Sequence, residues 1–487
     1  MINHLLRKEI LDQFLSLRFL ILAALAWLVV GVGFYDGIAH YRSSVNAYRE
    51  AQTATEERIQ QLRDADGRIS PTRWYYAELF GQGYLAHKPP SAMSLFVRGL
   101  APVLGRTLRV KGGFTERRLT RSPVAEAPIL EFFPSMDLGL VVQVVLSLFV
   151  VLLTYDAICG EKETGTLRLI ASFPVPRDQI LLAKLTGALA AVLTAFGLPL
   201  LLGVAVVLAL PDVNLTGSEL IRLGMIAAVT GVYLATFTCA GLLVSALTHR
   251  TATSFVLLLT FWVAAVVVVP RLSLIVADAA LPAPSAAEFE GRKRVVYWEE
   301  DRARLARCIA WARDYEGATG RSHWVSPEGR EAWYFMLQET KQQQRETAVS
   351  QRSRLEEAFR NRYDAWLGLA ATMARFSPAF ALSNASIRLA GTGMDRHKRF
   401  LRFCGAFLDR QHMWTHKTFL RGGLQRDHPG KYGAYRWDIS DMPRFDYHDV
   451  WPVEDIRAAV TDIAILVFWG AALALGGYVA MRRFDVR

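Results

Sequence analysis

The chain has 487 residues, of which 52% are hydrophobic and 21% are charged. This apolar content is too high for an ordinary soluble protein, and this charged content is too high for a pure membrane bundle, so we expect membrane helices combined with sizeable soluble segments. The net charge of +11 indicates positive loops that orient membrane helices. A nucleic-acid partner would require a basic patch with aromatic platforms on a soluble face, and we expect none.

Residues 1–18 predict an amphipathic helix that lies in the membrane interface, because their apolar side chains recur on one helical stripe. Residues 19–35 form an uncharged apolar run. With Leu15 and Leu17 ahead of it, this run is long enough to cross a hydrocarbon core of roughly 30 Å. We expect the first membrane span here. A cleaved signal peptide is the alternative, but no small-x-small cleavage site follows the run.

Residues 36–137 form the first soluble segment. It begins as a polar helical pattern that continues the first membrane helix, and after Gly67 it becomes rich in aromatic residues, proline and glycine. Alternating side chains around Leu108 and Val110 indicate a short strand. We expect a cap of mixed helix and strand.

Five further apolar runs predict membrane spans. They cover residues 138–155, 180–210, 220–247, 253–276 and 460–481. The run at 220–247 carries small residues, several of them three or four positions apart, which permits close packing of helices. These small residues are Gly224, Ala228, Gly231, Ala235, Cys239 and Gly241.

The second soluble segment covers residues 277–459. It is highly charged and helical, with one uninterrupted pattern from Pro327 to about Phe376. A helix of this length would reach roughly 70 Å at about 1.5 Å per residue, so a break or hairpin inside it stays open as an alternative.

Basic residues flank the apolar runs on one side of the predicted bundle, which is the cytoplasmic side by the positive-inside rule. If six helices cross in alternation, both termini and the loop at 156–179 fall on that side, and the two long segments lie outside. The predicted fold is therefore a mostly α membrane protein. It has six transmembrane helices, both termini inside, and a large, mainly helical extracytoplasmic domain built from two insertions.

Residues 156–179 are a polar interruption that is longer than a simple connection and shorter than a domain. Charged residues and a Gly-Thr pair fill the first half, and a Pro-Val-Pro sequence stands in the second half. We expect a short amphipathic helix that lies along the membrane face and contacts a partner protein. The candidate contact residues are Asp156, Glu161, Glu163, Gly165, Thr166 and Arg168.

The same stretch has the glycine spacing of a phosphate-binding loop, from Gly160 to Gly165. The lysine that such a loop needs is missing, and no buried strand precedes it. No other stretch supplies a comparable lysine. We therefore expect that this chain holds no cofactor and does not hydrolyse ATP by itself.

The pattern D-x-x-x-x-E-x-E-x-G-T-L, followed by P-V-x-R and by Lys184 in the next apolar helix, resembles the permeases of ABC-2-type ABC transporters. In that family this segment is the cytoplasmic coupling helix that docks on the ATP-binding subunit. The resemblance covers residues 1–35, 138–275 and 460–487. It implies a permease of the bacterial inner membrane, two partner ATPase subunits that hold ATP and Mg, and a second permease that is identical or homologous.

A second resemblance concerns the second soluble segment. Ser377-Pro378, the L-A-G-T-G run at 389–393 and the pair His397 and Phe400 resemble a bacterial subgroup whose large periplasmic insertion has no assigned function. That subgroup is similar to permeases linked to gliding motility and to the maturation of periplasmic copper enzymes. The resemblance leaves a periplasmic partner open and implies no substrate.

Two residue pairs in the second soluble segment are further candidates. His412 and His416 stand four positions apart, as two metal ligands on one helical face would, but the glutamate of a zinc protease is absent. They are weak metal candidates. Cys308 and Cys404 would both lie in an oxidising compartment, where a disulfide forms if the geometry allows it.

The apolar runs are almost free of ionisable residues, which argues against an ion-coupled carrier. We expect an ATP-driven exporter for a hydrophobic or amphipathic cargo. One alternative is a mechanotransmitter that passes force to periplasmic partners without moving a substrate. Another is a membrane sensor with an external ligand domain, but its cytoplasmic segments would be too short for an output domain.

Overall fold

The computed structural model describes residues 2–62, 84–110, 118–119, 137–167, 176–424, 441–447 and 453–483. Six helices in these ranges are long and apolar enough to cross a membrane. The prediction of a mostly α membrane protein with six spans is therefore confirmed. In chain order, the helices that form the spans are α2 (Leu17–Leu62), α5–η3–α6 (Leu138–Leu140, Val141–Leu146, Ser147–Thr154), α9 (Arg177–Ala209), α10 (Gly217–Leu247), α11–η4–α12 (Thr251–Val263, Ala264–Val268, Val269–Ala280) and α17 (Val453–Arg483).

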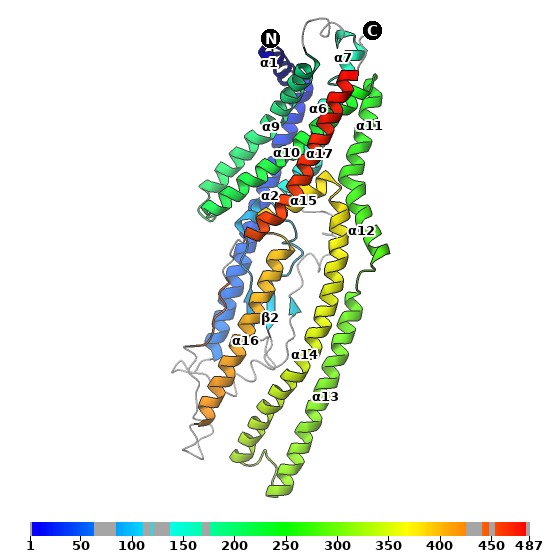
Figure 1. Cartoon of the computed structure of the whole chain (residues 1–487). Coiled ribbons are helices and arrows are strands. Elements are labelled where there is room, and N and C mark those ends of the chain that lie inside the picture. Colours follow the sequence, from blue (N-terminus) through cyan, green and yellow to red (C-terminus); the bar gives the residue numbers. More distant parts are fainter. Residues whose placement is uncertain are drawn as a thin grey trace.

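The remaining elements are mainly helical as well. They are α1 (Ile2–Phe14), α7 (Cys159–Glu163), α13 (Ala286–Thr319), α14 (Pro327–Ala374), α15 (Pro378–Ala390), α16 (Met394–Leu424), the short 3-10 helix η1 (Ala92–Leu95) and the strands β1 (Tyr84–His87), β2 (Thr107–Val110) and β3 (Arg118–Leu119). The start of α1, the end of α17 and α7 lie at one end of the helix bundle, whereas α13, α14 and α16 extend from the other end (Figure 1).

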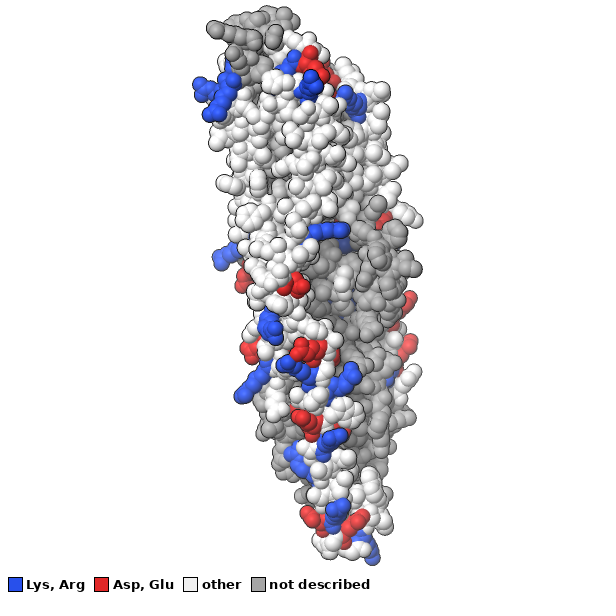
Figure 2. Space-filling view, turned by 90° about the vertical axis from the view of Figure 1, so that its right-hand side faces the viewer, with Lys and Arg blue, Asp and Glu red and all other residues white. Residues whose placement is uncertain are grey.

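The surface of the bundle is apolar between its two ends. In the view of Figure 2 almost no Lys, Arg, Asp or Glu interrupts this band, whereas the opposite half of the molecule carries charges of both signs. Large apolar side chains of the spans, such as Leu28, Leu201 and Phe468, are exposed. An exposed apolar surface of this extent matches lipid tails rather than water.

The first soluble segment contains the predicted helix and strand. The polar helix after residue 35 is the outer half of α2, which runs without interruption to Leu62. The strand predicted around Leu108 is β2, the central strand of a small antiparallel sheet in the order β1-β2-β3. Leu108 packs there against Phe400, Cys404 and Leu408 of α16.

The long helical pattern after Pro327 forms one unbroken helix of 48 residues, α14. The alternative of a break or hairpin inside it is wrong. Ser326 caps the helix by accepting a hydrogen bond from the backbone N–H of Gly329, and Pro327 occupies the first turn, where its missing N–H costs nothing. The hairpin lies instead between α13 and α14, whose two helices pack on each other.

Helix α15 occupies a place that the sequence did not suggest. It belongs to the segment expected outside the membrane, yet it packs against the spans α10 and α17 and joins their apolar core. Its sequence favours a short, well-capped helix. The Ser377 side chain accepts a hydrogen bond from the Phe380 N–H at the start, and Gly391 ends the helix with φ +64°.

Polar side chains tie α15 to the spans. The carboxylate of Asp462 on α17 is fully buried (0% exposed). It accepts hydrogen bonds from Arg375 Nε at 2.9 Å and from Asn384 Nδ2 at 2.7 Å. Ser383 donates to the side-chain oxygen of Gln143 in the π-helix η3. Since a buried charge is stable only when it is paired, α15 and its flank are needed to hold Asp462.

Close packing of α10 depends on one of its glycines. A β-carbon added at Gly241 would overlap the side chain of Thr154 in the second span, whereas one added at Gly224 or Gly231 would meet no atom within 4 Å. The prediction of close packing from small residues therefore applies to the inner end of α10.

We expect Gly241→Ala to destabilise the protein, because the new methyl group displaces Thr154 in the core. Gly231→Ala is the matched control, since alanine is favoured over glycine in a helix by about 1 kcal/mol and here meets no neighbour. The melting temperature of the purified protein in detergent should fall by several degrees for the first variant and stay level or rise for the second. Equal shifts would contradict the packing of α6 on α10.

We expect Asp462→Ala to lower the stability by about 3–5 kcal/mol, because it leaves Arg375 and Asn384 without their buried partner. Asp364→Asn is the control. It removes the partner of Lys398 at 2.7 Å in a half-exposed pair, and such pairs contribute about 0–1 kcal/mol. Denaturant unfolding in detergent measures both. A loss at Asp364 as large as that at Asp462 would show that burial does not set the effect.

Candidate functional site

In the described residues 156–167, the polar stretch after the second span begins with a turn and the short helix α7. Helix α7 has five residues, from Cys159 to Glu163, and Thr166 and Leu167 are again helical. Gly165 follows with φ +79°, a conformation that favours glycine. Residues 163–166 are exposed and Leu167 is buried. Arg168, the last of the predicted contact residues, lies outside the described residues.

A buried lysine on α9 holds this loop by its charge. Lys184 is only 5% exposed, and its ammonium lies 2.7 Å from Glu161 Oε1. It also lies 3.5 Å from both carboxylate oxygens of Glu9 on α1. Three elements, α1, α7 and α9, therefore share one buried ion cluster, which we call the Lys184 cluster (Glu9, Glu161 and Lys184).

One of the two carboxylate oxygens of Glu161 is buried without a hydrogen-bond donor. Its Oε1 binds Lys184, but its Oε2 is buried and accepts no hydrogen bond. Leaving a buried acceptor unsatisfied costs about 1–3 kcal/mol. This arrangement of the loop is therefore not the one that satisfies Glu161 best.

Lys8 adds positive charge at the edge of the cluster. Its ammonium lies 3.5 Å from Glu9 and 3.6 Å from Asp12. Burial lowers the pKa of Lys8, but the nearby carboxylates of Glu9, Glu161 and Asp12 raise it by more, so the pKa lies above its ordinary value. Lys8 therefore stays protonated at neutral pH and offsets part of the negative charge of the cluster.

The backbone of the loop is anchored to the end of α10. The hydroxyl oxygen of Ser245 accepts hydrogen bonds from the N–H groups of Ile158 and Cys159, both at 2.9 Å. In the opposite direction, the Lys162 ammonium donates to the carbonyl oxygens of Ala246 and, at 3.1 Å, Thr248. A cation that binds the last carbonyls of a helix also complements its dipole.

Two further contacts connect the loop to the spans α11 and α2. Glu163 accepts a hydrogen bond at 3.2 Å from the N–H of Thr251, the first residue of α11. Asp156 lies 2.5 Å from Arg18 of α2, whose guanidinium also stacks over the Tyr155 ring. Asp156, Glu161 and Glu163 were predicted to contact a partner protein, but all three bind other parts of this chain.

A cluster of buried apolar side chains completes the site. Ile158 and Leu167 of the loop are buried together with the spans' inner ends, at Ile180, Leu242 and Met481. Arg177 donates to the last carbonyl groups of α17, at 3.4 Å to Met481 and 2.9 Å to Arg482. The loop and its flanks thus contact α1 and the same end of all six spans.

Sequence reasoning missed several residues of this site. Lys184 was part of the recognised pattern and Glu9 stood in the amphipathic N-terminal helix, but neither was expected to bind Glu161. Their only signal was an ionisable residue close to, or inside, an apolar stretch. Ser245 had no signal, because a serine inside an apolar helix is common.

The weaker candidates of the soluble segment do not assemble into sites. Cys308 and Cys404 are not disulfide-bonded and are buried in separate apolar clusters, one between α13 and α14 and the other between α16 and β2. The possible disulfide between them is therefore not formed. His412 and His416 lie on α16, but their side chains are outside the described ones. Among the described side chains, no group of three His, Cys, Asp or Glu could hold a metal.

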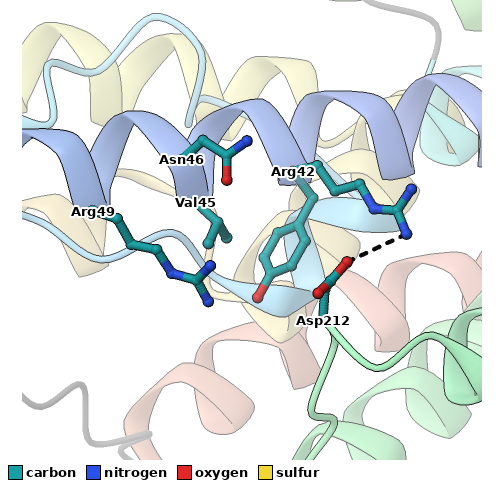
Figure 3. A pocket seen from close by; sticks show the side chains of 6 residues that line it. Arg42, Val45, Asn46, Arg49 and Asp212 are labelled. Atoms are coloured by element: carbon teal, nitrogen blue, oxygen red, sulfur yellow. Dashed lines mark ion pairs between the residues drawn. The ribbon is translucent and has the colours of Figure 1, made fainter.

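A polar pocket lies where the connection between α9 and α10 meets α2, away from α7. Figure 3 shows the side chains that line it. Residues from α2 and from the connection between α9 and α10 line it, and Arg42 lies 3.4 Å from Asp212 across it. Its lining residues are Tyr41, Arg42, Val45, Asn46, Arg49 and Asp212. Small-molecule sites are predominantly apolar, so this pocket does not match a site for an apolar cargo.

Comparison with known families agrees with this architecture. The model of a family described as ABC-2 family transporter protein matches residues 4–346, which is more than half of the chain. A second model, described as Domain of unknown function (DUF3526), matches residues 321–448. Curated proteins yield no match. With six membrane spans and a match that includes the Lys184 cluster, the chain belongs to the ABC-2 family of transporter proteins, as a transmembrane permease subunit.

Proposed function

We propose that this permease receives the power stroke of a separate ATPase through the Lys184 cluster and uses it to export a hydrophobic or amphipathic cargo. The family implies an ABC ATPase as partner. The single observation that carries the proposal is the position of α7, whose loop contacts α1 and the same end of every span. A push on this loop reaches the whole bundle at once.

The exposed residues 163–166 supply the surface on which the ATPase docks. They stand at the end of the bundle where α1 begins and α17 ends (Figure 1), and the positive-inside rule makes this end cytoplasmic. Glu161 lies behind them and is engaged with Lys184. We therefore divide the predicted contact residues into a docking part, from Glu163 to Thr166, and a transmitting part, at Asp156 and Glu161.

The Lys184 cluster transmits force because it is buried. Moving α7 away from α9 separates Lys184 from Glu161, and an unpaired buried charge costs several kcal/mol. The helices must therefore follow the loop. The unsatisfied Oε2 of Glu161 supports a second arrangement, in which this oxygen also gains a donor and the loop position differs.

ATP and Mg belong to the ATPase subunits in this proposal. Two ATPases and two permeases assemble, with the second permease identical or homologous, in the inner membrane of a bacterium. The second soluble segment then lies in the periplasm, where it gates the path or binds a partner.

A specific observation also favours mechanotransmission as a second function. α2 is one helix of 46 residues, which reaches about 69 Å at 1.5 Å per residue. That is more than twice the roughly 30 Å of a hydrocarbon core. Such a helix carries a displacement from the cytoplasmic end directly to the β-sheet of the soluble domain. Cargo transport in vesicles distinguishes the two functions.

Separating the charges of the Lys184 cluster tests the transmission. We expect Glu161→Lys and Lys184→Glu each to reduce ATP-driven activity of the purified complex by about tenfold or more, since breaking a buried pair costs about 3–5 kcal/mol. Co-purification of the ATPase should persist. The double variant should regain part of the activity, because it restores opposite charges at positions 161 and 184, although Glu9 then faces a like charge at position 184. Unchanged activity in both single variants would refute transmission through this cluster.

Straining the loop tests the docking. We expect Gly165→Val to lower the amount of ATPase that co-purifies with the permease, because a β-branched side chain does not tolerate φ near +79°. Gly160→Ala is the matched control, since Gly160 is helical and a β-carbon there makes ordinary contacts at 3.5 Å. A pull-down with the tagged ATPase measures both. If Gly165→Val assembles as well as Gly160→Ala, residues 163–166 are not the docking surface.

A further inference from the structure

Helix α13 has two apolar faces, one packed on α14 and one exposed. On one face Cys308 is buried against Met336 and Leu337 of α14. Further along this face Phe289 stacks on Phe359 of α14, with ring centroids 4.3 Å apart. This contact satisfies the need of α13 for one buried face.

The second apolar face of α13 is exposed on the described part of the chain. Its four large apolar side chains, Val295, Trp298, Leu305 and Ile309, are 45–56% exposed. They stand three, seven and four positions apart, and Arg302 lies within the gap of seven. This is the a and d spacing of a coiled coil. At 3.6 residues per turn the stripe lies on average about 100° around the helix from Cys308, and Leu305, three positions before Cys308, is its nearest member. We call this stripe the α13 seam: Val295, Trp298, Arg302, Leu305 and Ile309.

Lipid does not explain the seam. α13 begins beyond the ends of the spans and runs away from the bundle along the outer edge of the soluble domain (Figure 1). The neighbouring surface of this domain carries charges of both signs (Figure 2). A row of large apolar side chains in such a setting marks a site of protein association.

We propose that the α13 seam packs against the same seam of a second copy of this chain, as a short parallel coiled coil. The inference rests on the proposal that two permeases pair in the membrane. Both copies then share one orientation, and a two-fold axis along the membrane normal sets their α13 helices parallel.

The charges beside the seam fit this pairing. In a parallel two-stranded coiled coil, the g residue stands directly before an a position. It faces the e residue that lies five positions later on the other helix. Here Arg294 faces Glu299 of the second copy, and the reverse pair forms by symmetry. Both side chains are exposed. Arg302 stands at an a position, where a single polar residue specifies register and favours two strands at some cost in stability.

The seam is too short to create a dimer by itself. Two heptads are marginal in water. Pairing of the spans holds the two α13 helices at a high effective concentration. A contact that is too weak to form a dimer alone then forms within the pair. The α13 seam therefore aligns two soluble domains whose membrane parts are already paired.

Cysteine cross-linking in membranes tests the proposal on the full chain. The native cysteines are all buried. Leu305→Cys and Ile309→Cys place a thiol on the seam, and Ala303→Cys and Ala310→Cys place one at exposed neighbouring positions off it. Mild oxidation should yield a band of twice the chain mass, at least fivefold stronger for the seam variants. Adding Arg294→Glu to Leu305→Cys should weaken the band, and adding Glu299→Arg as well should restore it.

The mass of the purified protein is measured in parallel, so that the two proposals can fail separately. A dimeric mass with no preference for the seam variants overturns the α13 contact and leaves paired permeases standing. Cross-links from the seam to a protein of another mass also overturn it, in favour of a different partner. A monomeric mass without any cross-link overturns both the seam contact and the pairing.

Discussion

The buried ammonium group of Lys184 is the constraint on which the α7 end of this permease depends. A charge with so little exposure is stable only beside opposite charges, and the chain supplies them from two distant places, Glu161 on α7 and Glu9 on α1. The amphipathic N-terminal helix and the loop are therefore fixed to α9 together. A helix of only five residues gains the rigidity of the bundle through this one cluster.

The opposite end of the spans is organised by a second buried charge. Asp462 holds Arg375 and Asn384 and so keeps α15 between the spans. The same helix α17 carries Asp462 near one end and the carbonyl groups bound by Arg177 at the other. α10 likewise contacts the loop through Ser245 and α15 at its far end. Two rigid helices thus connect both charge clusters, which gives a displacement of the loop a direct route to α15.

The π-helices of the second and fifth spans lie along this route. η3 and η4 both contact α15, and η3 presents Gln143 to Ser383. π-helical turns are frequent at functional sites because they interrupt the regular ladder of helical hydrogen bonds. The two π-helices therefore place irregular helical turns where α15 packs on the spans.

The sequence by itself determined the spans, the polar extension of α2, the strand at Leu108 and the position of the polar loop after the second span. These features depend on local quantities: the length of an apolar run against the bilayer thickness, side-chain periodicity, and interruption by charge. Only the tertiary structure decided what the loop binds and where α15 lies. Glu161 and Lys184 are 23 positions apart, Asn384 and Asp462 are 78 apart, and Ile158 and Ser245 are 87 apart. Such partners meet because helices pack, and one-dimensional patterns carry no record of which faces pack together.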